Sequence, residues 1–133
     1  MSEWLEIKIP EIIRLYRGKP QQMQSPPVSE NKIYATNWIT KMRFTSEAAK
    51  VWKEEVAWTV KQIHPKIGRG SEMFLEIFLT FPPSKRKRDP GNYVKPIADA
   101  LTGILWDDDS GLKIIADGEI GEKWALKIRW GLK

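Results

Sequence analysis

The alternation of apolar and charged residues near the start of the chain predicts its first strand. Leu5, Ile7 and Ile9 are apolar, charged residues separate them, and the pattern stops at Pro10. A period of two residues is typical of a strand with one buried face and one face in water. We therefore expect a strand over residues 4–9.

The next segment, residues 10–44, has no sustained apolar period. Gly18, Pro20, Pro26 and Pro27 interrupt it, and the residues between them are mostly polar. Glycine and proline are the strongest local signals for turns and loops. We predict that residues 10–44 are a long loop, and a loop of this length in a small domain is usually functional or mobile.

A helical pattern follows Thr45 and Ser46, either of which suits the N-cap position. Apolar residues then recur every three or four positions, and charged residues occupy the opposite face. The pattern ends before His64 and Pro65. We expect a helix whose buried stripe consists of Ala48, Ala49, Val51, Trp52, Val56 and Val60.

Residues 73–81 form the strongest strand signal in the chain. Only Glu76 and Thr80 interrupt this apolar run. A continuous apolar run is typical of a central strand that is buried on both faces. Two closing strands are expected over residues 112–120 and 123–130, joined near Gly121.

A second helix is expected between the central strand and the closing strands. Asn92 suits its N-cap, and apolar residues continue at helical spacing as far as Leu105. Pro96 falls within the first turns, where it removes a backbone donor. We therefore expect an irregular first turn.

The order of these elements is strand, loop, helix, strand, loop, helix, strand, strand. It contains no internal repeat and no second domain boundary, and a chain of 133 residues suits one domain. We predict a single α+β domain over residues 1–133, with a mixed sheet flanked by two helices.

Composition excludes several kinds of site. The chain has no Cys and one His, so it contains no disulfide, no thiolate zinc site, no cysteine nucleophile and no histidine-rich metal site. No apolar run approaches the roughly 18 residues of a membrane span, and the start of the chain lacks the basic residues of a signal peptide. We expect no contact with a membrane and a cytoplasmic location.

Charge is segregated along the chain. The 22 Lys and Arg residues exceed the 17 Asp and Glu residues, which gives a net charge of +5. Residues 85–88 form a basic run, whereas Asp107, Asp108 and Asp109 form an acidic one. A basic surface favours a polyanion such as nucleic acid. A solvated surface with no partner is the alternative.

The ends of the second helix carry residues that suit phosphodiester chemistry. Asp89 and Lys95 lie at its start, and the acidic run follows its end. Grouped carboxylates repel one another unless a cation such as Mg²⁺ neutralises them. Mg²⁺ can activate water for phosphodiester cleavage, and a lysine can stabilise the negative charge that develops. The alternatives are a solvated acidic turn, an Asp89 that only caps a turn, and a Lys95 that pairs with Asp99.

The segment from residue 86 to residue 109 also resembles a known signature. It reads Arg86-Lys87-Arg88-Asp89-Pro90-Gly91-Asn92-Tyr93-Val94-Lys95 through Asp99-Ala100-Leu101-Thr102, followed by Trp106-Asp107-Asp108-Asp109. RusA-type Holliday junction resolvases carry a similar basic run, an Asp-x-Asp-Asn-x-x-Lys motif, an Asp-Ala-Leu-Thr motif and an acidic pair. The resemblance implies a homodimeric endonuclease that cuts four-way DNA junctions with Mg²⁺ or Mn²⁺.

The resemblance also implies roles for individual residues within the catalytic segment 85–109. It assigns catalysis to Asp89, Lys95 and Asp109, and metal binding to Asp89, Asp108 and Asp109. It assigns DNA binding to the basic run and to the motif asparagine, which are Lys85, Arg86, Lys87, Arg88 and Asn92. We expect the basic run to contact the DNA backbone rather than to read sequence, because it contains no Asn or Gln.

Gly91 departs from the signature, because the family has an aspartate at this position. Glycine offers no carboxylate to a metal. The chain is then an inactive or engineered form, or Asp107 or Asp108 compensates, or the protein binds junctions without cutting them efficiently. Two other functions stay open: a structure-selective DNA-binding protein without catalysis, and a Mg²⁺-dependent phosphodiesterase that acts on a small nucleotide.

A shared metal site requires Asp89 and Asp109 to lie close together. A helix over residues 92–105 would separate its ends by about 20 Å at 1.5 Å per residue. The chain must therefore return along the helix, or Asp109 must come from a partner subunit. Trp4, Trp38, Trp106 and Trp124 are candidates for a dimer interface, for stacking on unpaired bases or for the core.

Overall fold

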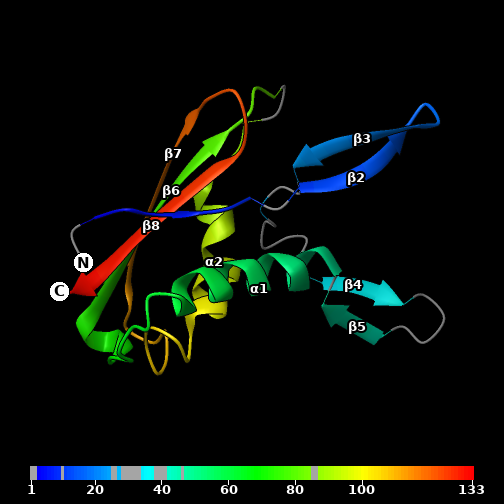
Figure 1. Ribbon diagram of the computed structural model, residues 1–133. Coiled ribbons are helices and arrows are strands. Elements are labelled where there is room, and N and C mark those ends of the chain that lie inside the picture. The colour runs from blue at the N-terminus through cyan, green and yellow to red at the C-terminus, as the bar shows by residue number, and fades with distance from the viewer. Residues whose placement is uncertain are drawn as a thin grey trace.

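The computed structural model describes residues 3–9, 11–24, 27, 34–37, 42–45, 47–84 and 87–133. Its main sheet has four strands in the order β1-β8-β6-β7 (Figure 1). The sheet is mixed, because β6 pairs in parallel with β7 and antiparallel with β8, which in turn pairs antiparallel with β1. These strands are β1 (Leu5–Ile7), β6 (Met73–Phe81), β7 (Lys113–Ile120) and β8 (Ala125–Leu132).

Two helices cover one face of this sheet. They are α1 (Glu47–Lys61) and α2 (Val94–Leu101), and they pack against each other. A single hydrophobic core joins Trp52 and Val56 of α1, Ile97 of α2 and Leu75 and Ile77 of β6. The predicted α+β domain with a mixed sheet and two helices is therefore confirmed.

The central strand begins and ends as its apolar run predicts, but only one of its faces is covered. Along β6, fully buried residues alternate with half-buried ones. Phe74 and Phe78 lie on the half-buried face, where the ammonium of Lys127 lies 4.9 Å from the Phe78 ring centre. The expectation of burial on both faces is therefore wrong, because the apolar residues of the second face contact aromatic rings and charged side chains instead of a second layer.

The predicted loop over residues 10–44 contains two β-hairpins, so this prediction is wrong. Strands β2 (Glu11–Tyr16) and β3 (Lys19–Gln24) form one hairpin, and β4 (Tyr34–Asn37) and β5 (Met42–Thr45) form the other. Arg17 and Gly18 link β2 to β3, and both have positive φ, of 51° and 75°. Two consecutive residues with positive φ form a two-residue turn whose twist matches the right-handed twist of the flanking strands. Pro20 is tolerated because β3 lies at an edge.

Helix α1 agrees with four positions of its predicted buried stripe and differs at one, and the burial of the sixth, Ala48, is not described. Ala49, Trp52, Val56 and Val60 are buried, whereas Val51 is 40% exposed. The helix ends at Lys61, before His64 as predicted. The alternative cap Ser46 lies outside the described residues.

Helix α2 is shorter than predicted, and Asn92 does not cap it. Asp89 caps a 3-10 turn, η3 (Pro90–Tyr93), and α2 then begins at Val94. Pro96 therefore stands in the first turn of α2, where a backbone N–H has no partner within the helix. The helix ends at Leu101 instead of Leu105. The predicted irregular start of the helix is confirmed.

The closing strands occur where predicted, but they do not pair with each other. β6 lies between β7 and β8, and α2 belongs to the crossover that joins β6 to its parallel neighbour β7. A parallel pair needs such a crossover, because its strands start at the same edge of the sheet. Among the described residues, no helix is long and apolar enough to cross a membrane.

Candidate nucleic-acid site

Asp89 lies in the connection between the end of β6 and η3. Its carboxylate accepts a hydrogen bond of 2.9 Å from the backbone N–H of Gly91, and its side chain is exposed. Asp89 therefore caps the turn, as one sequence-based alternative proposed. Only one of its oxygens accepts this bond, so the capping role leaves the other oxygen available to a cation or to water.

Gly91 lies directly beside that carboxylate. A Cβ atom built on Gly91 would lie 3.2 Å from Oδ1 of Asp89, and its nearest atoms among the described residues, its two chain neighbours aside, all belong to Asp89. The φ angle of Gly91 is outside the left-handed region, so the backbone admits other residues. An aspartate here would place a second carboxylate next to the first, as in the signature that the sequence resembles.

Lys95 is the second residue of α2 and forms the ion pair that the sequence suggested as an alternative. Its ammonium lies 3.5 Å from a carboxylate oxygen of Asp99, and Lys53 of α1 lies 4.0 Å from the same oxygen. The Lys95 side chain is 53% exposed. An exposed pair of this kind contributes little stability, on the order of 0 to 1 kcal/mol, so the lysine can exchange this partner for a phosphate.

The acidic run follows α2 at the opposite end of the sheet. One oxygen of Asp107 accepts hydrogen bonds from the backbone N–H groups of Gly70, at 3.2 Å, and Asp108, at 2.7 Å. These bonds, the one from Gly70 above all, lower the pKa of Asp107. Asp108 in turn accepts a bond from the N–H of Ser110. Asp109 is exposed, and its carbonyl accepts from Leu112. Through its bonds from Gly70 and Asp108, Asp107 therefore stabilises the loop that contains the acidic run.

Asp89 and Asp109 are not brought together within one chain. Asp89 follows the end of β6, whereas the acidic run is bonded to Gly70, just before β6 begins. Nine residues in a strand span about 26 Å at roughly 3.3 Å per residue. In the described part of the chain, no three His, Asp or Glu side chains are grouped closely enough to hold a metal. Neither Asp107 nor Asp108 therefore replaces the missing carboxylate at Gly91 within one chain.

The basic run is described only in its second half. Lys85 and Arg86 lie outside the described residues, whereas Lys87 is exposed and Arg88 is half-buried. The guanidinium carbon of Arg88 lies 4.6 Å from the ring centre of Trp124. Asn92 is half-buried within η3, where its backbone N–H donates to the carbonyl of Asp89.

The tryptophans named from the sequence have different environments. Trp106 is fully buried in the core, and Trp38 lies outside the described residues. Trp4 stands on the uncovered sheet face, with its ring centre 6.3 Å from that of Phe78. Trp124 lies beside the Asp89 connection. The core explanation therefore holds for Trp106 and is wrong for Trp4.

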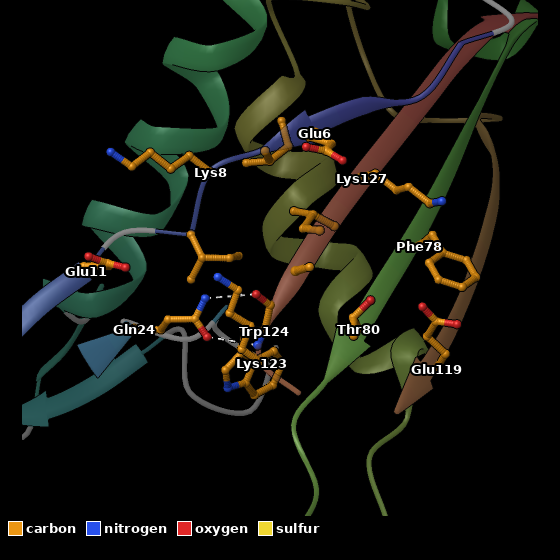
Figure 2. A pocket seen from close by; sticks show the side chains of 14 residues that line it. Glu6, Lys8, Glu11, Gln24, Phe78, Thr80, Glu119, Lys123, Trp124 and Lys127 are labelled. Atoms are coloured by element: carbon orange, nitrogen blue, oxygen red, sulfur yellow. Dashed lines mark hydrogen bonds between the residues drawn. The ribbon is translucent and has the colours of Figure 1, made fainter. Parts of the chain in front are cut away.

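A cavity of about 400 Å³ opens beside Trp124, between β1, the start of β2, the end of β6 and the start of β8 (Figure 2). Its charged lining is balanced, with three acids and three bases: Glu6, Glu11, Glu119, Lys8, Lys123 and Lys127. Balanced charge gives no preference for an anion. Figure 2 also shows Gln24 of β3 bonded to the backbone of Trp124 at the edge of this cavity.

Sequence reasoning missed two residues near Asp89. Tyr93 is buried in η3, and burial raises its pKa while the positive charge of Arg88 opposes that shift. Gln24 bonds to a residue 100 positions further along the chain, a contact for which the sequence carries no local signal.

A family model described as endodeoxyribonuclease RusA matches residues 24–129, which is well over half of the chain. The matched range includes Asp89, Gly91, Lys95 and the acidic run. No curated protein matches the chain.

Proposed function

The chain belongs to the RusA endodeoxyribonuclease family, and we propose that it is a Mg²⁺-dependent endonuclease that resolves four-way DNA junctions in recombination and repair. The observation that carries this proposal is the family match across the segment that contains Asp89, Lys95 and Asp109. The exposed side chains of Asp89, just before η3, and of Lys95, at the start of α2, support it, because they are accessible to a DNA backbone.

The acids of one chain do not by themselves fit a shared metal ion. Carboxylate oxygens suit Mg²⁺ or Mn²⁺, but Asp89 and Asp109 occupy opposite ends of β6. We therefore propose a homodimer in which Asp109, with Asp108, comes to Asp89 of the other copy. A bound Mg²⁺ would supply an activated water and stabilise the leaving oxygen. A dimer with two such sites also matches the symmetry of a junction cut on two strands.

The other residues of the site receive their proposed roles from their position and charge. Lys95 is within reach of a phosphate at the start of α2, where its positive charge would stabilise the negative charge of the transition state. The basic run, which consists of Lys85, Arg86, Lys87 and Arg88, would hold the backbone, and Asn92 lies beside it in η3. Asp89 keeps its place because the N–H of Gly91 fixes its carboxylate.

Gly91 favours a second function, a structure-selective DNA-binding protein that does not cut. Affinity for DNA comes mainly from Lys and Arg contacts with phosphate, so the loss of one carboxylate leaves binding intact. Cleavage depends on the metal and is slowed by that loss.

The test compares a synthetic four-way junction with a linear duplex of the same sequence, each with and without Mg²⁺. Tight junction binding with Mg²⁺-dependent paired cuts supports the nuclease. Tight junction binding without cuts supports the binding protein. Equal binding to both DNAs would contradict both proposals, and hydrolysis of a small nucleotide diester alone would favour the phosphodiesterase.

A further inference from the structure

Trp124 stands at the meeting point of three segments that surround Asp89. Its ring centre lies 5.4 Å from that of Phe81, at the end of β6, and 5.9 Å from that of Tyr93, in η3. Arg88 stacks on the same indole at 4.6 Å and directly precedes Asp89. One side chain therefore contacts the residues on both sides of the Asp89 turn.

Arg88 depends on this ring for its position. Its Nη1 atom is buried and has no hydrogen-bond acceptor among the described residues. A guanidinium that lacks acceptors is held by the attraction between its charge and the face of an aromatic ring. Without the indole, the Nη1 end of this group would lose the ring it stacks on, and Nη1 has no acceptor among the described residues to hold it instead.

Trp124 is itself held by a side chain from the β2–β3 hairpin. The amide of Gln24 donates from Nε2 to the Trp124 carbonyl at 3.0 Å, and its Oε1 accepts from the Trp124 N–H at 2.9 Å (Figure 2). This pair of bonds imitates the pairing of two strands. It fixes the backbone of Trp124 just before β8 begins, and it joins the hairpin to the sheet.

We propose that Gln24 and Trp124 are positioning residues, which hold the Arg88 guanidinium and the adjoining Asp89 turn in the orientation that engages DNA phosphate. The inference rests on the proposed function, because it assumes that Arg88 contacts DNA. It goes beyond that function by making the β2–β3 hairpin part of the site. Trp124 acts through Arg88 and needs no contact with the substrate.

The first test is a double-mutant cycle on the affinity for a four-way junction. Arg88→Ala, Trp124→Leu and the double variant are compared with the wild type, and Trp124→Phe keeps an aromatic face. We expect Trp124→Leu to weaken binding several-fold, Trp124→Phe to restore most of that loss, and the double variant to bind no more weakly than Arg88→Ala alone. Additive losses would overturn the proposal.

Gln24→Ala tests the connection to the hairpin, and Gln22→Ala is its matched control. Gln22 is on the same strand, but its amide donates to Glu11 of β2 instead of to Trp124. Gln24→Ala should weaken junction binding in the same direction as Trp124→Leu, and Gln22→Ala should not. Equal effects of the two glutamine variants would contradict a specific role for Gln24.

A measurement without DNA separates the inference from the proposed function. The ring current of Trp124 should shift the Nε–Hε resonance of Arg88 in the isotope-labelled full chain, and Trp124→Leu and Gln24→Ala should both remove much of that shift. Thermal unfolding verifies that the variants are folded. A wild type that shows the shift but binds no junction refutes the proposed function, whereas a missing shift refutes the positioning role.

Discussion

The missing carboxylate at Gly91 is the residue-scale feature with the largest consequence for activity. We predict that Gly91→Asp increases the rate of Mg²⁺-dependent junction cleavage by orders of magnitude, because it adds a ligand beside the Asp89 carboxylate. Gly91→Asn is the control, since it has the same shape without the charge. The rate is measured in single-turnover cleavage, and metal affinity by calorimetry.

Two outcomes would contradict this prediction. Rapid Mg²⁺-dependent cleavage by the Gly91 chain would show that another carboxylate supplies the ligand. A Gly91→Asp chain that binds junctions but does not cut any branched DNA would favour the binding protein.

Asp107 has a structural role that its neighbour Asp109 does not share. Its pKa is lowered by hydrogen bonds from the backbone of Gly70 and then Asp108, so it favours the folded state when ionised. This stabilisation is present above the ordinary aspartate pKa and is lost as the pH falls through the lowered value. We predict that Asp107→Ala reduces the melting temperature at neutral pH, and that the difference narrows in acid.

The matched control for this prediction is Asp109→Ala, which removes a carboxylate from the same loop. Its effect on the melting temperature should be smaller, because the backbone carbonyl of Asp109, which accepts from the N–H of Leu112, is kept in the alanine variant. A difference between wild type and Asp107→Ala that stays constant down to strongly acid pH would contradict the pKa argument.

At the scale of elements, the sequence correctly predicted strands and helices whose apolar pattern lies within one short stretch of the chain. The apolar run over β6 and the helical period of α1 correctly predicted both elements. The β2–β3 hairpin was missed because Pro20 and Gly18 are also strong loop signals, although Arg17-Gly18 is a suitable two-residue hairpin turn. The pairing of β6 with β7 depends on residues almost 40 positions apart, so neither the parallel order nor the separation of Asp89 from Asp109 could be obtained from spacing alone.

Gly18 gives a prediction at this scale. Its φ is +75°, and a Cβ would meet nothing within 4 Å, so only the backbone conformation opposes a side chain. We predict that Gly18→Ala destabilises the β2–β3 hairpin by about 1 kcal/mol, and that Gly18→Asn costs less because asparagine tolerates this region. Hydrogen exchange of the Trp124 amide, which bonds to Gln24, reports the change. Equal exchange rates in the glycine and alanine proteins would contradict it.

At the scale of the whole molecule, the separation of the two acids makes subunit mixing informative. In a Gly91→Asp background, chains with Asp89→Asn are mixed with chains that carry Asp109→Asn. If Asp109 completes the site of the partner subunit, one of the two sites in a mixed dimer contains an unchanged Asp89 and an unchanged Asp109. Cleavage then returns in the mixture, although each variant alone is inactive. If both acids act within one chain, every site in the mixture lacks one of them and stays inactive.

For the proposed homodimer, we predict that two copies pair through the outer edge of β7. Among the described strands, β7 pairs only with β6, and the more exposed face of β7 carries Ile115, which is 44% exposed. An unprotected edge strand of eight residues is a template for pairing with another chain. If two β7 strands pair in antiparallel orientation, the sheets of the two copies point in opposite directions. The end of the sheet that carries Asp89 in one copy then lies toward the end that carries Asp109 in the other.

Charge along β7 gives this interface a specific test. A pairing centred on Ala116 sets Lys113 of each copy opposite Glu119 of the other, and both side chains are exposed in the single chain. Opposite charges across strands contribute roughly 0.2 to 1 kcal/mol per pair, and like charges repel. We predict that Lys113→Glu or Glu119→Lys alone raises the dimer dissociation constant by at least about 4-fold, since each of the two pairs then loses roughly 0.2 kcal/mol or more of attraction and gains a similar repulsion. The double variant should restore it, whereas Lys50→Glu on α1 should have no effect. Sedimentation equilibrium measures the constant, and a double variant that dissociates like the single ones would place the interface elsewhere.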